Sequence, residues 1–468
     1  MPPVRGRRPT LVLAAVAVCA TALADPAPQS GADPGAPATP ARPAPASHDP
    51  QLLGAQYTFV EQEQTALLSP YQGKLSLLPG GDRQQTHTIG LYSGWAPLDW
   101  AQLYFDTEKF MGAGVSSATG VAGPTNGDVL RQGAPGLKKE FYIARLYARL
   151  LLPLGAATTA VTRAQDQIPG SEADTRLDLK LGRLAVSDDF DRNRYAGAAR
   201  TQFMNTSLWQ NTAWDYAANT RGYTDGVVIA YISPAWSLRY GIYRMPLFAN
   251  GQTLETLNRA RGENLELTLA SAATGTIVRL LAYRNTARMG DYAYALALAA
   301  ASGGVPSIAA DDAEGRHKVG AGVNLEQPLA DEGESGLFLR LGWNDGKTED
   351  FAFTEVDRHA SLGGQISGAH WSRAEDRLGV GLLHEGISPE HRDYLAAGGS
   401  GFLLGDGRLN YRPEEIFEAY YRAQWSFSHA ADTLRVQLSP DFQYIQNPGY
   451  NQDRGPVRFY SLRLHLEY

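Results

Sequence analysis

The chain has 468 residues, with 42 Lys and Arg against 49 Asp and Glu, and its net charge is −7. Charged residues make up 19% of it, below the roughly 25% that is usual for soluble domains. The acidic balance argues against a general nucleic-acid binder, which normally carries a clustered basic surface. No run of about 18 apolar residues follows the first 24 residues, so the sequence excludes helical membrane spans.

The N-terminus has the pattern of an export signal. A basic stretch is followed by an apolar run from Leu11 to Ala20, and Ala22-Leu23-Ala24 supplies the small residues that signal peptidase reads. We therefore expect residues 1–24 to be a cleaved signal peptide and the mature chain to begin near Asp25.

The only cysteine, Cys19, lies inside this expected leader. A lipoprotein signal could use it, but Val18 stands where such a signal needs a small residue, so we favour cleavage near Asp25. The next segment, residues 25–50, is dense in Ala and Pro and nearly free of large apolar side chains. Because it cannot bury enough surface to offset its ordering entropy, we expect a flexible periplasmic tether.

From Leu53 onward the hydrophobic pattern has a period of two, as in β-strands. In the segment Ile416 to Phe427, one face carries Phe417 and Trp425 while the other carries Glu418 and Arg422. In a soluble sandwich the polar face would be the outside, whereas in an outer-membrane barrel it lines the lumen and the apolar face meets lipid. The alternation alone does not choose between the two.

The spacing of the strands distinguishes an outer-membrane barrel from a soluble sandwich. We place sixteen strands at 53–62, 85–95, 101–110, 140–152, 175–184, 222–232, 235–244, 262–270, 276–287, 314–327, 336–346, 357–369, 376–387, 413–427, 432–446 and 455–468. Their connections mostly alternate between short and long, which is typical of bacterial barrels with short periplasmic turns and long external loops. The sequence therefore predicts an all-β fold, a 16-stranded antiparallel transmembrane β-barrel over residues 51–468. The segment Pro153 to Asp174 departs from the rule, because it is long where a short turn is due.

The last strand has one apolar face that ends on the terminal aromatic residue, Tyr468. Outer-membrane barrels present such a strand to their insertion machinery. We expect the barrel-assembly machinery, outer-membrane lipid and lipopolysaccharide as partners, with the chain as a homotrimer or a monomer.

Several ordered motifs make the chain similar to the carbohydrate-selective porins (OprB-like) of Gram-negative outer membranes. The motifs are Ser69-Pro70-Tyr71-Gln72-Gly73, the run from Asp189 to Ala196, the run from Arg200 to Asn205, Tyr283-Arg284-Asn285, Trp343-Asn344-Asp345-Gly346, His391-Arg392-Asp393-Tyr394, Tyr411-Arg412-Pro413-Glu414, Tyr450-Asn451 and Asp453-Arg454-Gly455. The resemblance implies a sixteen-stranded barrel in the outer membrane that lets small sugars diffuse into the periplasm. A channel for anions or sugar acids, and a mainly structural or adhesive barrel, stay open as alternatives.

Strand parity points a mixed set of charges into the lumen. Asp106 and Glu108 share the inner face of one strand, and Arg145 and Arg149 share that of another. Guanidinium groups donate to adjacent hydroxyls and carboxylates accept from them, so such a mixture suits a neutral polyol. Aromatic faces such as Trp209, and Tyr104 and Tyr147 on the same two strands, could stack on a pyranose. We expect the first four residues and Trp209 to form a sugar-binding constriction.

A constriction is needed because a sixteen-stranded barrel is otherwise too wide to select a monosaccharide. The connection from Ala185 to Arg221 is the longest in the barrel, and it is the third long loop. We expect it to fold into the lumen, helped by the loop from Met111 to Lys139.

The chemistry motifs are otherwise weak. Asp189, Asp191 and Asn193 have the opening spacing of a calcium loop, but Arg194 and Arg200 stand where that loop needs Gly and a bidentate acid. Contacts that anchor the loop are the preferred interpretation, and we expect no metal or other cofactor. The histidines and serines form no catalytic constellation, so we do not expect an enzyme.

Overall fold

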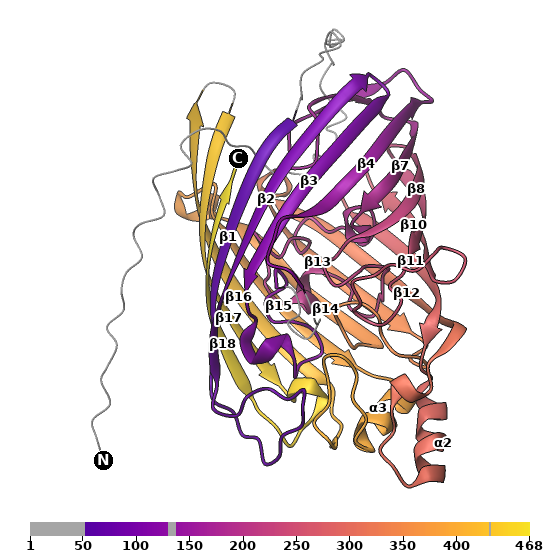
Figure 1. Ribbon diagram of the computed structural model, residues 1–468. Helices are drawn as coiled ribbons and strands as arrows, with labels where there is room; N and C mark the ends of the chain where they lie inside the picture. The colour runs from indigo at the N-terminus through magenta and orange to yellow at the C-terminus, as the bar shows by residue number, and fades with distance from the viewer. Residues whose placement is uncertain (1–51, 130–136, 430–431) are drawn as a thin grey trace.

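Sixteen strands of the computed structural model close into one antiparallel barrel (Figure 1). The structure describes residues 52–129, 137–429 and 432–468. The expected signal peptide (1–24) and the expected tether (25–50) both lie outside the described residues.

The barrel strands follow one another round the wall in chain order, and β1 closes the ring against the last strand, β18. They are β1 (Leu52–Gln64), β2 (Asp82–Leu98), β3 (Ala101–Gly112), β4 (Tyr142–Pro153), β7 (Arg176–Leu184), β8 (Thr224–Ile232), β9 (Trp236–Arg244), β10 (Arg261–Ala270), β11 (Ile277–Met289), β12 (Ala313–Ala330), β13 (Ser335–Asn344), β14 (Arg358–Ser367), β15 (Arg377–Gly386), β16 (Glu414–His429), β17 (Asp432–Gln446) and β18 (Val457–Glu467). All sixteen expected strands are confirmed, and their ends lie within three residues of the expected ones.

The two faces of each strand meet different surroundings. On β18, Leu462 points outward and is 45% exposed, while its neighbour Arg463 points inward and is 1% exposed. On β16, Trp425 faces outward and Glu418 is buried inside. The apolar face therefore lies toward lipid and the polar face toward the lumen, as expected of an outer-membrane barrel.

The lumen is filled largely by loops that fold inward, and these loops supply much of the buried core. Phe203, from the loop between β7 and β8, packs edge-on against Phe338 of β13 and Tyr420 of β16, with ring centroids 5.6 and 5.0 Å apart. In the same loop, the indole of Trp214 donates to Asn264 of β10 at 2.8 Å. The expectation that this loop enters the barrel is confirmed.

The long segment after β4 folds as a separate two-stranded hairpin, β5 (Thr158–Val161) and β6 (Gly170–Ala173). It connects β4 to β7 at the periplasmic end, and the Arg163 guanidinium lies 5.5 Å from the ring of Tyr468 at the C-terminus. This hairpin explains why the connection is long where a turn is due.

The opposite, external end carries two helices that the strand pattern did not predict, α2 (Tyr292–Ser302) and α3 (Pro389–Ala396) (Figure 1). Asp291 caps α2 through the amide of Tyr294, and Gly303 ends it with a φ of 69°, which glycine adopts without strain. Over the described residues, no helix has both the length and the apolar character to cross a membrane.

Candidate functional site

The four charged residues expected on the wall all face the lumen. Asp106 pairs in register with Arg145 across β3 and β4, and their outward neighbours Phe105 and Leu146 are 45% and 52% exposed. The strand parity inferred from the sequence is therefore correct here. A β-bulge beside Asp106 shifts the register by one residue, which brings Tyr142 opposite Glu108.

Arg145 joins the wall to two different inward-folded segments. Its Nε and Nη2 atoms donate to the two carboxylate oxygens of Asp188, at 2.7 and 2.9 Å. Its Nη1 atom lies 3.5 Å from Asp106 and 3.3 Å from Asp166, which belongs to the β5–β6 hairpin. Three carboxylates from three parts of the chain thus surround one guanidinium.

Arg149 makes a second set of contacts closer to the periplasmic end. It donates to Glu172 of β6 at 2.6 Å and to Asp178 of β7 at 2.5 Å. Glu172 also pairs with Arg176 at 2.6 Å. Arg149 of β4 and Arg176 of β7 therefore fasten the hairpin to the inner wall, while its two strands pair with each other in a separate sheet.

Glu108 is the centre of a third group at the external side of the same wall. Its carboxylate accepts from Arg200 at 2.9 Å, from the hydroxyl of Tyr223 at 2.6 Å and from that of Tyr142 at 3.2 Å. Arg200 bridges onward to Asp128 of the β3–β4 loop at 2.7 Å. Both inward-folded external loops therefore meet on Glu108.

Trp209 lies at the meeting point of those two loops. It is the last residue of the short helix α1 (Thr206–Trp209), and its side chain is half-buried. The indole lies so close to Gly127 that a β-carbon there would collide with it, and the Gly127 amide donates to Met204 at 2.7 Å. The second loop therefore does support the first, as the sequence led us to expect.

Two other aromatic candidates are not available to a solute. Tyr104 and Tyr147 stack on each other with ring centroids 4.8 Å apart, and they are 1% and 6% exposed. The Tyr104 hydroxyl accepts from the amide of Ile168 in the hairpin at 3.3 Å. These rings support the periplasmic hairpin instead of presenting a face to the lumen.

The weak calcium motif is engaged in contacts within the protein. Asp189 accepts from Lys180 at 2.8 Å, Asp191 lies 3.0 Å from the Arg340 guanidinium, and Asn193 donates to Asn324 at 2.7 Å. Arg340 is on β13, seven strands from β4 in a ring of sixteen. Asp189 contacts the adjacent strand β7, whereas Asp191 and Asn193 anchor the loop to β13 and β12 on the far side of the barrel, so that it crosses the lumen.

The charged side chains of this site differ in their exposed fraction. The carboxylate of Asp106 is fully buried and that of Glu108 is 3% exposed, whereas Arg145 and Arg149 are 13% and 14% exposed. Asp188 is 34% exposed. The exposed charge is therefore that of the two arginines and Asp188, whereas Asp106 contacts Arg145 and Glu108 contacts Arg200.

The sequence missed part of this group. Asp166 and Glu172 lie in a segment with no strand expectation, Arg200 lies in the middle of the long loop, and Tyr223 directly precedes β8. The one available signal was the length of the Pro153 to Asp174 connection, since a long segment at the periplasmic end needs a place to pack.

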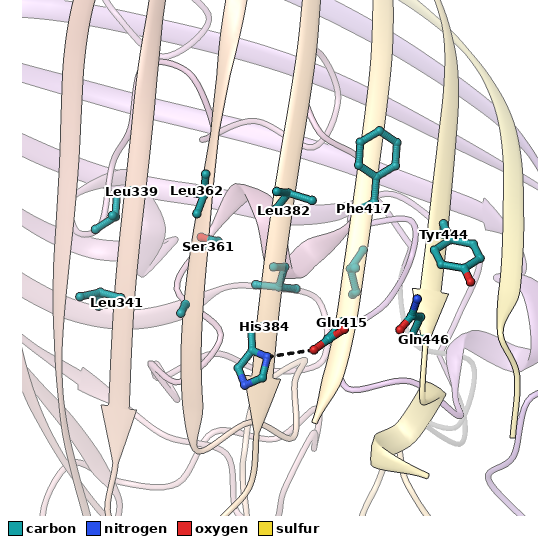
Figure 2. A pocket seen from close by; sticks show the side chains of 13 residues that line it. Leu339, Leu341, Ser361, Leu362, Leu382, His384, Glu415, Phe417, Tyr444 and Gln446 are labelled. Atoms are coloured by element: carbon teal, nitrogen blue, oxygen red, sulfur yellow. Dashed lines mark ion pairs between the residues drawn. The ribbon is translucent and has the colours of Figure 1, made fainter. Parts of the chain in front are cut away.

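A groove on the outside of the barrel is separate from this group. It has a volume of about 400 Å³ and crosses β13 to β17, and Figure 2 shows Leu341, Leu362 and Leu382 along it. Those leucines are 47%, 54% and 49% exposed on the outer face, and His384 pairs with Glu415 at 3.5 Å at one end. The groove therefore faces lipid and not the path of a solute.

Comparison with solved structures agrees with this architecture. The high-pH structure of Pseudomonas putida OprB superposes with a TM-score of 0.65 at 17% identity, covering 89% of this chain and 94% of that one. The low-pH structure of the same protein gives a TM-score of 0.44 at 12% identity, covering 89% and 92%. The outer-membrane channel DcaP of Acinetobacter baumannii gives 0.45 at 9% identity, covering 89% and 96%. No curated protein matches the sequence.

The family comparison goes further than the fold. The sequence model of the carbohydrate-selective porin, OprB family matches residues 107–468, which include β4 to β18, both arginines and the whole inward-folded loop between β7 and β8. The chain therefore belongs to the carbohydrate-selective porin, OprB family, and is an outer-membrane sugar porin.

Proposed function

We propose that this porin selects sugars where the loop of residues 185–223 meets β3 and β4. The observation that carries the proposal is the pair of hydrogen bonds from Arg145 to Asp188, which fastens the start of the loop to the wall. The contact of Asp191 with Arg340 fastens the same loop across the lumen. A loop held at both sides narrows a barrel that would otherwise be wide.

The exposed groups at this place suit a neutral polyol. The partly exposed guanidinium groups of Arg145 and Arg149 are the donors, and the Asp188 carboxylate is an acceptor. The half-buried indole of Trp209 offers an apolar face for a sugar ring. Asp106 contacts Arg145 and Glu108 contacts Arg200, so we assign these two acids a positioning role in the constriction.

A second candidate solute is an anion or a sugar acid. Arg192, in the same loop, is exposed, and its charged neighbours include Arg279 and Arg239 on the inner faces of β11 and β9. Three guanidinium groups on one side of the passage favour negative charge. The carboxylates of Asp188 and Asp189 nearby oppose that preference.

Export, assembly and neighbours follow from the proposed topology. We infer cleavage of the leader after residue 24 and recognition of β18, with Tyr468 directly after it, by the barrel-assembly machinery. The exposed apolar outer face indicates contact with outer-membrane lipid and lipopolysaccharide. A homotrimer and a monomer are both compatible with this outer face.

Planar-bilayer recording tests the constriction. Arg145→Gln and Arg149→Gln should weaken the block of ion current by glucose or maltose several-fold, whereas Arg183→Gln should not. Arg183 is a matched control, because it lies on the neighbouring strand β7, opposite the outward-facing Leu146 and therefore on the outer face. A shortened loop, with folding checked by heat-modifiable mobility, should raise conductance and abolish discrimination between mono- and larger saccharides.

The same recordings separate the candidate functions. A strong preference for gluconate over glucose as blocker, lost in Arg192→Gln, would favour the acid channel. Wild-type conductance and sugar block in both the shortened loop and the two arginine variants would place the constriction elsewhere.

A further inference from the structure

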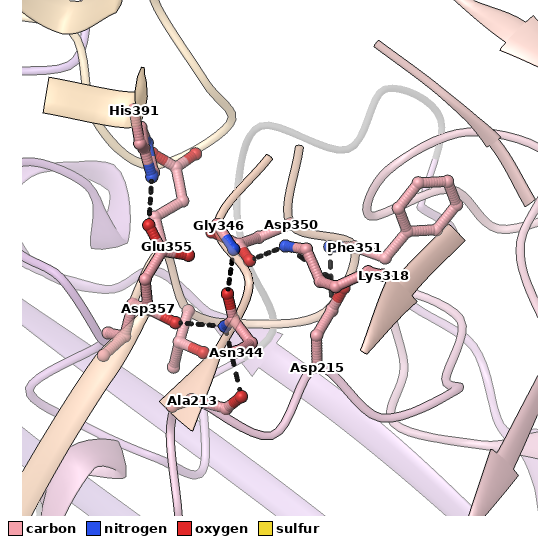
Figure 3. Close-up of polar contacts among 12 residues, drawn as sticks. Ala213, Asp215, Lys318, Asn344, Gly346, Asp350, Phe351, Glu355, Asp357 and His391 are labelled. Atoms are coloured by element: carbon pink, nitrogen blue, oxygen red, sulfur yellow. Dashed lines mark hydrogen bonds and ion pairs between the residues drawn. The ribbon is translucent and has the colours of Figure 1, made fainter. Parts of the chain in front are cut away.

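A buried polar cluster at the external end joins the β13–β14 loop to α3. Asp350 and Asp357 come from that loop and His391 comes from α3, and one ligand atom of each lies within 4.8 Å of the others. Their side chains are 2%, 0% and 0% exposed. Figure 3 shows His391 above Asp357, with Asp350 beside Lys318.

Each of the three side chains has one atom that is fixed by the protein and one that is not. Asp357 Oδ2 accepts from the amide of Ser388 at 2.7 Å and lies 3.3 Å from His391 Nδ1. Asp350 Oδ1 accepts from Lys318. Asp350 Oδ2, Asp357 Oδ1 and His391 Nε2 are buried and have no hydrogen-bond partner among the described residues. Leaving such buried atoms without a partner is unfavourable, and a bound cation would satisfy all three.

The charges of the cluster do not balance without a cation. The carboxylates of Asp215, Asp350 and Asp357 surround one ammonium group, that of Lys318, which lies 3.7 Å from Asp215. A buried excess of negative charge is costly, and a divalent cation would compensate it.

The packing around His391 keeps the cluster rigid. The imidazole stacks on Tyr292 of α2, with ring centroids 4.3 Å apart and planes 13° apart. The amide of His391 donates to Ser388, which caps α3, at 3.0 Å. The imidazole is therefore held in one orientation by two helices, as a ligand needs to be.

We propose that Asp350, Asp357 and His391 bind one divalent transition-metal ion of the zinc class, which ties the β13–β14 loop to α3 at the external end of the barrel. Carboxylate oxygens and imidazole nitrogens are both zinc ligands, with bonds of about 2.0–2.2 Å. Calcium is disfavoured because it takes oxygen ligands only. Lys318 orients Asp350 through the carboxylate oxygen that the ion does not use.

Zinc titration of the untagged, full-length folded protein tests this site. After EDTA treatment and gel filtration, added Zn²⁺ should be retained at about one ion per chain by elemental analysis, and it should raise the thermal midpoint of the folded barrel. His391→Gln and Asp350→Asn should weaken zinc binding at least tenfold. His384→Gln is the matched control, because this histidine lies on the outer face and is 58% exposed.

Each result decides the matter. Retention of zinc by the wild type and by His384→Gln, with loss in His391→Gln, supports the site. The site is absent if the wild type retains no zinc, if His391→Gln binds as tightly as the wild type, or if Ca²⁺ binds in place of Zn²⁺. Heat-modifiable mobility confirms that every variant is folded before it is scored.

Discussion

The guanidinium of Arg145 and the carboxylate of Asp188 form a bidentate ion pair (the clasp), with donor–acceptor distances of 2.7 and 2.9 Å. The clasp connects β4 of the wall to the first residues of the loop that crosses the lumen. A planar fork makes both bonds at once, which a lysine ammonium cannot do.

Arg145→Lys should therefore keep the charge of the wall but loosen the loop. Loss of one charge-assisted hydrogen bond costs about 1.5–3 kcal/mol, so amides near residues 186–190 should exchange roughly 10- to 100-fold faster with deuterium. Single-channel current should become noisier. Arg183→Lys, on the outer face of β7, is the control, and equal exchange in both variants would mean that the clasp does not hold the loop.

The β5–β6 hairpin supplies the second set of contacts to the same wall. Asp166 and Glu172 neutralise Arg145 and Arg149 from the periplasmic side. Replacing residues 155–174 by a short turn should leave the β4–β7 pairing intact, because the barrel register does not depend on the hairpin. Conductance should rise and the preference for anions should increase, since two arginines lose a carboxylate.

Reversal potentials in a KCl gradient measure that change. The double variant Asp166→Asn, Glu172→Gln is the companion, because it removes the charges and keeps the hairpin. If the deletion and the double variant both behave as the wild type does, the hairpin lies outside the conducting path.

The outer face of β18 allows a test of membrane orientation. Leu464 faces outward, and its neighbour His465 is 3% exposed and contacts Thr58 at 2.8 Å on the inside. A cation on the lipid face near mid-membrane costs roughly 2–4 kcal/mol, whereas inner positions are less sensitive. Leu464→Arg should therefore reduce folded protein in outer membranes much more than His465→Arg, as heat-modifiable mobility would show.

The sequence predicted the wall of this protein better than its contents. Strand positions follow from alternation of side chains, which is a local property, and so Asp106 and Arg145 could be placed on facing inner surfaces. The partners of Arg145 could not be predicted in this way, because Asp166 and Asp188 reach Arg145 only after two loops have folded inward. A loop that packs in a polar lumen has no hydrophobic period, and its contacts come from strands far away in the chain.

The same limit explains the cluster at the external end. Asp350, Asp357 and His391 have no metal-ligand spacing in the sequence, and the helix that positions His391 was not expected. The motif that carries His391 pointed to the family, but not to a role for the histidine. Only the packing of α3 on α2 brings the three side chains together.

Glu349, in the β13–β14 loop, gives the external end a dependence on pH. Its carboxylate accepts from the amide of Gly290 at 2.7 Å, and burial raises its pKa to about 7. Between pH 4.5, the ordinary pKa of a glutamate, and about pH 7, its pKa in the closed loop, the closed loop holds the proton more tightly than the open loop does. Closing of the loop is therefore favoured at low pH, and the advantage is lost as pH rises through 7, by at most about 3 kcal/mol.

Hydrogen exchange in EDTA at pH 5 and pH 8, corrected for intrinsic rates, measures the opening of residues 345–357 and of the start of α2. The opening free energy should be smaller at pH 8 in the wild type and nearly independent of pH in Glu349→Gln, because the amide cannot ionise. Glu390→Gln, on the first turn of α3, is the control for a carboxylate at the same end of the barrel. An equal opening free energy of the wild type at the two pH values would mean that the pKa of Glu349 is the same in the closed and the open loop. The carboxylate would then not cause a pH response.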